Sequence, residues 1–174
     1  MARKRGLAIG KPTILVGITG VGDTMASDMA PLGRVLKNST VLDTSEGSDA
    51  DVKDEHDNVV HVETEPGKTT LVYSVFVYGL EILKKIFGGT IVTSGVDDDV
   101  LTGLKNGFSA IVEDFWSFDI SWRAGVGIRA PKSKVTATVV STSTEGILLK
   151  MKHTVVAPEG LDADMIEPYE PKAA

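Results

Sequence analysis

The chain of 174 residues contains no cysteine, which excludes disulfide bonds, a cysteine nucleophile and zinc sites with cysteine ligands. Basic residues are also few, because 18 lysines and arginines stand against 24 aspartates and glutamates, for a net charge of −6. Proteins bind nucleic acid largely through lysine and arginine contacts to phosphate. We therefore expect neither a disulfide-stabilised scaffold nor a general duplex-binding protein.

Long apolar runs are missing as well. No window approaches the ~18 apolar residues that a transmembrane helix needs. The basic start precedes only the short apolar stretch from Gly6 to Gly10, which Lys11 and Pro12 end, whereas a secretory signal needs about 7–15 apolar residues. We therefore expect no membrane partner and synthesis in a reducing cytoplasm.

The sequence does contain repeated alternation of apolar and polar residues, which is the pattern of half-buried β-strands. In the segment 115–123, for example, Trp116, Phe118 and Ile120 point one way and the intervening polar residues the other. The segment 69–78 is apolar on both faces, which predicts that both of its sides are covered. Further strands are predicted at 13–20, 60–65, 134–142 and 147–156.

One helix is predicted at residues 78–87. Leu80, Leu83 and Phe87 fall on one face of it, and two lysines occupy its last turn, where the helix dipole favours cations. Gly88 follows as a residue typical of a helix end.

These elements predict one mainly β domain over residues 1–158, consistent with roughly one domain per 100–200 residues. We expect an antiparallel β-sandwich or partial barrel with one flanking helix at about residues 79–87. Long loops are predicted at 22–39 and 43–58, and an acidic, proline-containing tail at 159–174 is predicted to extend from the body. Two smaller predictions are a second short helix at 100–105 and a hairpin turn at 142–146.

A glycine-rich segment from Gly17 to Thr24 follows a predicted strand and spells G-x-x-x-x-G-D-T. A phosphate-binding loop has lysine where this segment has Asp23, and the lysine is needed to reach the phosphates. A carboxylate beside a triphosphate reverses the sign of the main interaction. Pro31 also limits the helix that would have to follow. We interpret the segment as a glycine-rich strand exit.

Three groups of acidic and histidine residues have the chemistry of cation ligands. Asp49, Asp51 and Lys53 occupy positions 1, 3 and 5 of an EF-hand template, but lysine cannot ligate calcium and no glycine follows. The acidic run Asp97–Asp99 could help hold a cation, and His56 with His61 could form a weak surface metal site, although acidic loops are more often simply solvated. We expect no metal and no cofactor.

Aromatic and acidic residues raise the possibility of a carbohydrate site, because Asp114 and Asp119 flank the aromatic strand. Trp116 and Trp122 alternate with apolar rather than basic neighbours, which favours a core role over stacking on single-stranded nucleic acid. His153 lies on an apolar strand face, as a core or interface histidine would. We expect no enzyme, and the alternative function that remains open is a non-catalytic β-sandwich binding module for carbohydrate or protein.

The order of elements in the second half of the chain is distinctive. The strand at 69–78 runs directly into the helix, a Gly88-Gly89-Thr90 turn follows, and Ile128-Arg129-Ala130-Pro131-Lys132 introduces the paired strands 134–142 and 147–156. In this order the chain resembles a bacteriophage major tail protein, the subunit of the tail tube. The resemblance covers about residues 40 to 158.

The resemblance implies two antiparallel sheets with a flanking helix, and homohexameric rings that stack into a hollow tube. Other tail proteins would be its partners, and DNA would pass through the tube without specific binding. It implies a location in the virion tail after assembly in the bacterial cytoplasm. It carries no catalytic residues.

Under that interpretation, acidic side chains at the lumen or surface would repel the phosphates of passing DNA. Pairing between subunits would also remove exposed strand edges, and we expect Tyr73, Val75 and Val77 to lie in the subunit-interface strand. The candidate lumen or surface residues are Asp49, Asp51, Asp54, Glu55, Asp97, Asp98 and Asp99.

Overall fold

The computed structural model describes residues 11–45, 47–65, 67–94, 101–105, 111, 114–122, 125–159 and 165–171. This part of the chain is mainly β, with one α-helix, as the sequence predicts. The elements in chain order are β1 (Thr13–Ile18), the 3-10 helix η1 (Val21–Asp23), β2 (Val41–Thr44), β3 (Ser48–Lys53), β4 (Val59–Glu65), β5 (Thr69–Phe76), α1 (Leu80–Phe87), β6 (Thr90–Ser94), β7 (Leu101–Lys105), β8 (Phe115–Ser121), β9 (Gly127–Thr142), β10 (Gly146–Val155) and β11 (Glu167–Tyr169).

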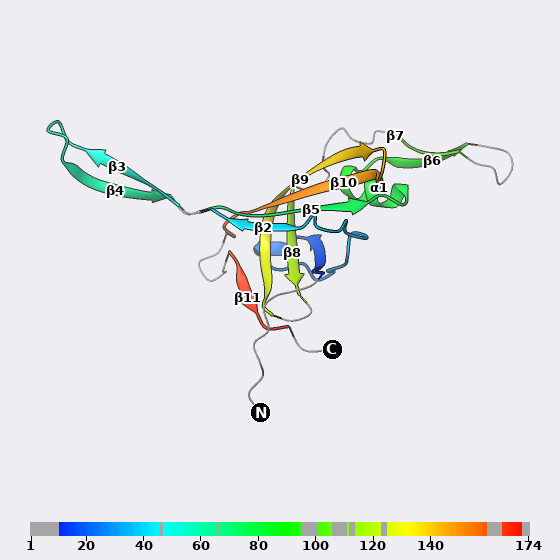
Figure 1. The fold of residues 1–174 in the computed structure, drawn as a ribbon, viewed down its shortest axis with the longest axis horizontal. Helices are drawn as coiled ribbons and strands as arrows, with labels where there is room; N and C mark the ends of the chain where they lie inside the picture. The colour runs from blue at the N-terminus through cyan, green and yellow to red at the C-terminus, as the bar shows by residue number, and fades with distance from the viewer. Residues whose placement is uncertain are drawn as a thin grey trace, which may run out of the picture.

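The main sheet is antiparallel and has the strand order β1-β8-β9-β10-β5-β2, with β11 also paired to β9. Two smaller sheets consist of β3 with β4 and of β6 with β7. In Figure 1, the β3–β4 hairpin extends from one end of the molecule and the β6–β7 hairpin from the other. Both hairpins therefore project from a body formed by the main sheet.

The long strand β9 gives the sheet its shape. Its first half pairs with β8, from Ile128 opposite Ile120 to Lys134 opposite Phe115. Its second half pairs with β10, from Ser133 opposite Val155 to Thr142 opposite Gly146. Figure 1 shows β8 and the first half of β9 crossing the direction of β10 and β5. The sheet consequently curves around one core as a partial barrel, in agreement with the predicted fold class.

The core fills the concave side of this sheet. Side chains alternate between buried and half-buried along β5, and the buried positions face those of β8 and β10. Burying one such large apolar side chain stabilises a fold by about 1.5–3 kcal/mol. The largest fully buried members are Trp116, Tyr73, Phe118, Leu71, Ile86, Ile120, Leu149 and Met151.

Helix α1 closes one side of the core through Leu83, Ile86 and Phe87. It ends at Gly88, whose N–H donates to the carbonyl of Lys84. Gly88 has a φ of 69°, a left-handed conformation that residues with a Cβ rarely adopt. The predicted helix and its glycine stop are both confirmed.

Several details differ from the sequence predictions. The second helix predicted at 100–105 is wrong, because Leu101–Lys105 forms β7 and pairs with β6, and its Thr102 and Gly103 are weak helix formers. The tail does not simply extend from the body, since β11 within it pairs with β9. On β8, Ser117 and Asp119 were predicted to face outward, but both are buried.

His153 lies at the centre of the core and is hydrogen-bonded at both ring nitrogens. Nε2 is 3.2 Å from the Tyr73 hydroxyl, and Nδ1 is 3.0 Å from Ser133 Oγ. Ser133 uses its single proton to donate to the Trp116 carbonyl at 2.6 Å, so Nδ1 must carry a hydrogen and donate to Ser133. Nε2 then accepts from Tyr73. The neutral ring satisfies every polar atom, and burial lowers the pKa of His153 to about 3.

This histidine makes the fold sensitive to acid. In the unfolded chain its pKa returns to about 6.5, so below that pH the unfolded state binds a proton that the folded state does not. The stability that the neutral His153 contributes should therefore be complete above about pH 6.5. Between about pH 6 and pH 4.5 this group alone should lower the free energy of unfolding by about 2 kcal/mol. Urea unfolding at both pH values should show a smaller loss for His153→Gln, and equal losses in the two proteins would contradict the assignment.

Candidate assembly surfaces

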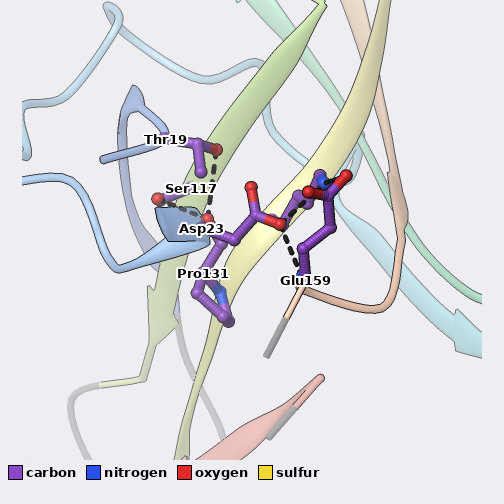
Figure 2. A network of polar contacts seen from close by, with 6 residues as sticks. Thr19, Asp23, Ser117, Pro131 and Glu159 are labelled. Carbon is purple, nitrogen blue, oxygen red and sulfur yellow. Dashed lines mark hydrogen bonds and ion pairs between the residues drawn. The ribbon is translucent and has the colours of Figure 1, made fainter. Parts of the chain in front are cut away.

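A polar network joins the exits of β1 and β10 to β9. Its centre is the buried amine of Lys132, which donates to Asp23 Oδ2 at 2.7 Å and lies 3.9 Å from Glu159 Oε1. Asp23 Oδ2 also accepts the backbone N–H of Glu159 at 2.6 Å, and Figure 2 shows the two acidic residues meeting beside β9. The hydrogen bonds from Lys132 and from the Glu159 N–H lower the pKa of Asp23. Asp23 is thus an ion-pair partner within the fold.

The same network secures the glycine-rich segment after β1. Ser117 Oγ donates to the Pro131 carbonyl at 2.6 Å, and Thr19 Oγ1 donates to the same oxygen at 3.1 Å (Figure 2). Ser117 Oγ in turn accepts the N–H of Ala26 at 3.0 Å. The loop therefore covers the face of β8 that the sequence assigned to solvent, which explains why Ser117 is buried.

A second polar cluster holds β11 against β9. The Tyr169 hydroxyl donates to Asp119 Oδ1, and Arg129 Nε lies 3.0 Å from Asp119 Oδ2. The Arg129 guanidinium stacks 4.0 Å from the centre of the Tyr169 ring. Burial and the bond to Asp119 raise the pKa of Tyr169. Gly127 leaves room for this ring, because a Cβ there would lie 2.4 Å from Tyr169 Cζ.

Among the described residues, two edges of the main sheet have no backbone pairing at all, whereas the outer edge of β1 is bridged by Ala30 opposite Val16. One is the outer edge of β2, which pairs only with β5. The other is the edge of β9 from Thr136 to Thr142 that faces away from β10. That stretch reads Thr-Ala-Thr-Val-Val-Ser-Thr and carries neither charge nor proline, the devices by which proteins usually protect an exposed edge.

The β3–β4 hairpin is a third surface. Its strands pair only with each other among the described elements, and a two-stranded hairpin is marginally stable in water unless it packs on something. At its turn Asp54 Oδ1 accepts the N–H groups of His56 and Asn58 at 2.8 and 2.9 Å. Beside the turn, Val59 and Val60 are 50% and 63% exposed.

A pocket of about 520 Å³ opens between the start of β1, the end of β8 and the segment before β2. Trp122 is half-buried in its wall, and Lys11 and Lys37 are exposed at it. Neither lysine makes an ion pair within the described part of the chain. The remaining lining residues are Pro12, Val35, Leu36, Asn38, Thr40 and Leu42.

The candidate acidic residues lie on or near the β3–β4 hairpin as far as the structure describes them. Asp54 and Glu55 are exposed at its turn. The backbone of Asp49 and Asp51 belongs to β3, whereas their side chains lie outside the description. Asp97, Asp98 and Asp99 lie outside the described residues altogether. The outward face of β10 instead presents two exposed lysines, Lys150 and Lys152.

The candidate interface side chains on β5 have partners within the chain. Tyr73 and Val75 are 1% and 0% exposed in the core, and Val77 is half-buried. β5 is an inner strand between β10 and β2, so its core-facing side chains are not available to a neighbour. In the part of the chain that the structure describes, the edges without pairing belong to β2 and β9, and the uncharged, threonine-rich run in β9 is a sequence signal for one of them.

The histidines and aspartates that could form a metal or carbohydrate site do not come together in the described structure. His56 and His61 are exposed on the hairpin, while His153 is in the core. No group of three metal-ligating side chains occurs among the described residues. Asp119 is bound by Arg129 and Tyr169, and Asp114 is exposed.

Comparisons of the chain with models of protein families and with curated protein sequences gave no match. Within the described residues, no helix has the length and apolar character needed to cross a membrane.

The packing of Tyr169 against Gly127 is testable. Gly127→Ala should displace the ring and free β11, so amides of residues 167–169 should exchange hydrogen faster, and overpacking should cost about 1–3 kcal/mol of stability. Gly79→Ala is the matched control, because a Cβ at Gly79 meets nothing within 4 Å. Unchanged protection of β11 in the Gly127→Ala protein would argue against this anchoring.

Proposed function

We propose that this chain is the structural subunit of a phage or prophage tail tube, in which copies join side by side into rings and the rings stack around a DNA conduit. The observation that carries the proposal is the pair of edges on β2 and β9 that have no partner within the described part of the chain. They lie on opposite sides of the four-stranded section β9-β10-β5-β2, so one edge of a copy can pair with the other edge of the next.

Such pairing is head-to-tail, because two different edges meet. Head-to-tail contacts close into a ring when the rotation between copies divides a full turn. Closure gives the β2 and β9 edges a partner in every copy, which is how barrels avoid the aggregation that open edges cause. A hexameric ring is the stoichiometry that the tail-tube resemblance implies.

The net negative charge of the chain supports passage of DNA through the tube without tight binding. The chain has a net charge of −6, so the assembled wall carries a surplus of negative charge that opposes tight binding of phosphate. Three exposed acidic side chains, Asp54, Glu55 and Asp57, lie at the hairpin turn, whereas the outward face of β10 presents Lys150 and Lys152. DNA is proposed to pass without specific contacts, and no catalytic role is assigned to the chain.

The alternative function is a β-rich binding module for carbohydrate or protein. The pocket beside Trp122 favours it, because aromatic side chains in a concave site are common in ligand binding. Trp116, the other tryptophan considered for such a site, is fully buried. A monomer that binds a ligand in this pocket would support this alternative over the tail tube.

Edge pairing can be tested by placing charge on the β9 edge. Thr138 and Val140 are exposed, and Thr138→Lys with Val140→Lys should block pairing without disturbing the core. Sedimentation velocity and negative-stain electron microscopy should show rings or tubes for the unaltered chain and mainly monomer for the double variant.

The control places the same two charges just beyond the edge. Ser143→Lys with Thr144→Lys lies in the exposed turn between β9 and β10 and should assemble like the unaltered chain. A strict monomer at high concentration in the unaltered protein would refute the proposal. Rings that persist in the β9 edge variant would refute the role assigned to this edge.

A further inference from the structure

The β3–β4 hairpin has apolar and acidic groups that the rest of the described chain does not cover. Its six-residue strand β3 spans about 20 Å at about 3.3 Å per residue, long enough to reach another molecule. We call residues 54–60 the acidic tip. They combine the exposed side chains of Asp54, Glu55 and Asp57 with the exposed Val59 and Val60. Any surface that covers the tip must accept both carboxylates and apolar groups.

The pocket between β1, β8 and the segment before β2 offers the opposite chemistry. We call it the lysine pocket. Pro12, Val35, Leu42 and Trp122 provide apolar contact, and Lys11 and Lys37 supply two cations without ion-pair partners in the described part of the chain. Its volume of about 520 Å³ is enough for several side chains.

We propose that the acidic tip of one copy docks in the lysine pocket of a second copy of this chain. The carboxylates would pair with Lys11 and Lys37, while the exposed valines would pack against the apolar wall beside Trp122. Charge complementarity selects this occupant, because the tip is acidic and the pocket is basic although the chain as a whole is acidic. The inference rests on the proposed function, since it requires the chain to assemble with itself.

The direction of the hairpin indicates which copy is reached. The edges of β2 and β9 face sideways, across the strands, and are used within a ring. The hairpin instead prolongs the line of β2 and β5 beyond the body (Figure 1). Strands in a closed barrel run within about 45° of the barrel axis, so a hairpin that prolongs them points toward the next ring. Docking of the tip therefore connects stacked rings.

Crosslinking tests the contact directly, because the chain has no cysteine of its own. One preparation carries Glu55→Cys and a second carries Lys37→Cys, both at exposed positions. The two are mixed, allowed to assemble and treated with a short bismaleimide, and the linked peptides are identified by mass spectrometry. We expect a link between positions 55 and 37 of different chains, several-fold more abundant than for Glu145→Cys mixed with Lys37→Cys, since Glu145 lies in the exposed turn before β10.

Charge reversal supplies an independent measurement. Glu55→Lys and Lys37→Glu should each shorten the stacks seen by electron microscopy and leave single rings, whereas the two changes together should restore stacking. Glu145→Lys, with the same change in net charge as Glu55→Lys, should have no effect. Asp54 is left unchanged because its carboxylate holds the turn through His56 and Asn58.

The outcomes separate this inference from the proposed function. Rings without the 55–37 link, or stacks unaffected by either charge reversal, overturn the docking and leave ring formation intact. A 55–37 link in a protein that forms no rings supports the docking and refutes edge pairing. Absence of the link under every condition overturns the docking whether or not rings form.

Discussion

The structure depends on the way that β9 divides its hydrogen bonds between two neighbours. Its first half pairs with β8 and its second half with β10, on opposite edges. A strand shared in this way forces the sheet to curve, and the curve encloses the side chains of β5, β8, β10 and helix α1. It also leaves the second half of β9 with one edge unpaired in the described chain. The feature that builds the core thus creates the surface proposed for assembly.

Polar groups inside this curved sheet are all accounted for by specific partners. His153 is held neutral between Tyr73 and Ser133, and Lys132 is buried only because Asp23 neutralises it. In the described residues no buried side-chain nitrogen or oxygen lacks a hydrogen bond. Because an unpaired buried polar group costs about 1–3 kcal/mol, such partners make one arrangement of the strands preferable to shifted alternatives.

Alternating hydrophobicity predicted most strands, and the stripe ending at Gly88 predicted the helix, because both signals come from nearby residues. The short segment 101–105 was predicted wrongly, since its strand depends on pairing with β6. The burial of Asp119 could not be foreseen either, because Tyr169 reaches it from 50 residues away. For the candidate site, sequence located the acidic segment but not the lysine pocket, whose walls come from three separate parts of the chain. The sequence placed the interface on β5, whereas the strand order of the described residues leaves edges of β2 and β9 unpaired, and only the β9 edge carries a signal in the sequence, its uncharged, threonine-rich run.

The short connection between β9 and β10 affects how a newly synthesised chain folds. These strands are joined by a tight turn at residues 143–145, whereas β1 must find β8 across about 100 residues of chain. Local hairpins form in microseconds, and contacts between distant segments form more slowly. The β9–β10 hairpin can therefore exist before β1 and β8 join the curved sheet, with its uncharged threonine-rich edge already open. Newly made chains can therefore associate through this edge while they are still folding. The risk of aggregation is greatest when many chains are synthesised at the same time.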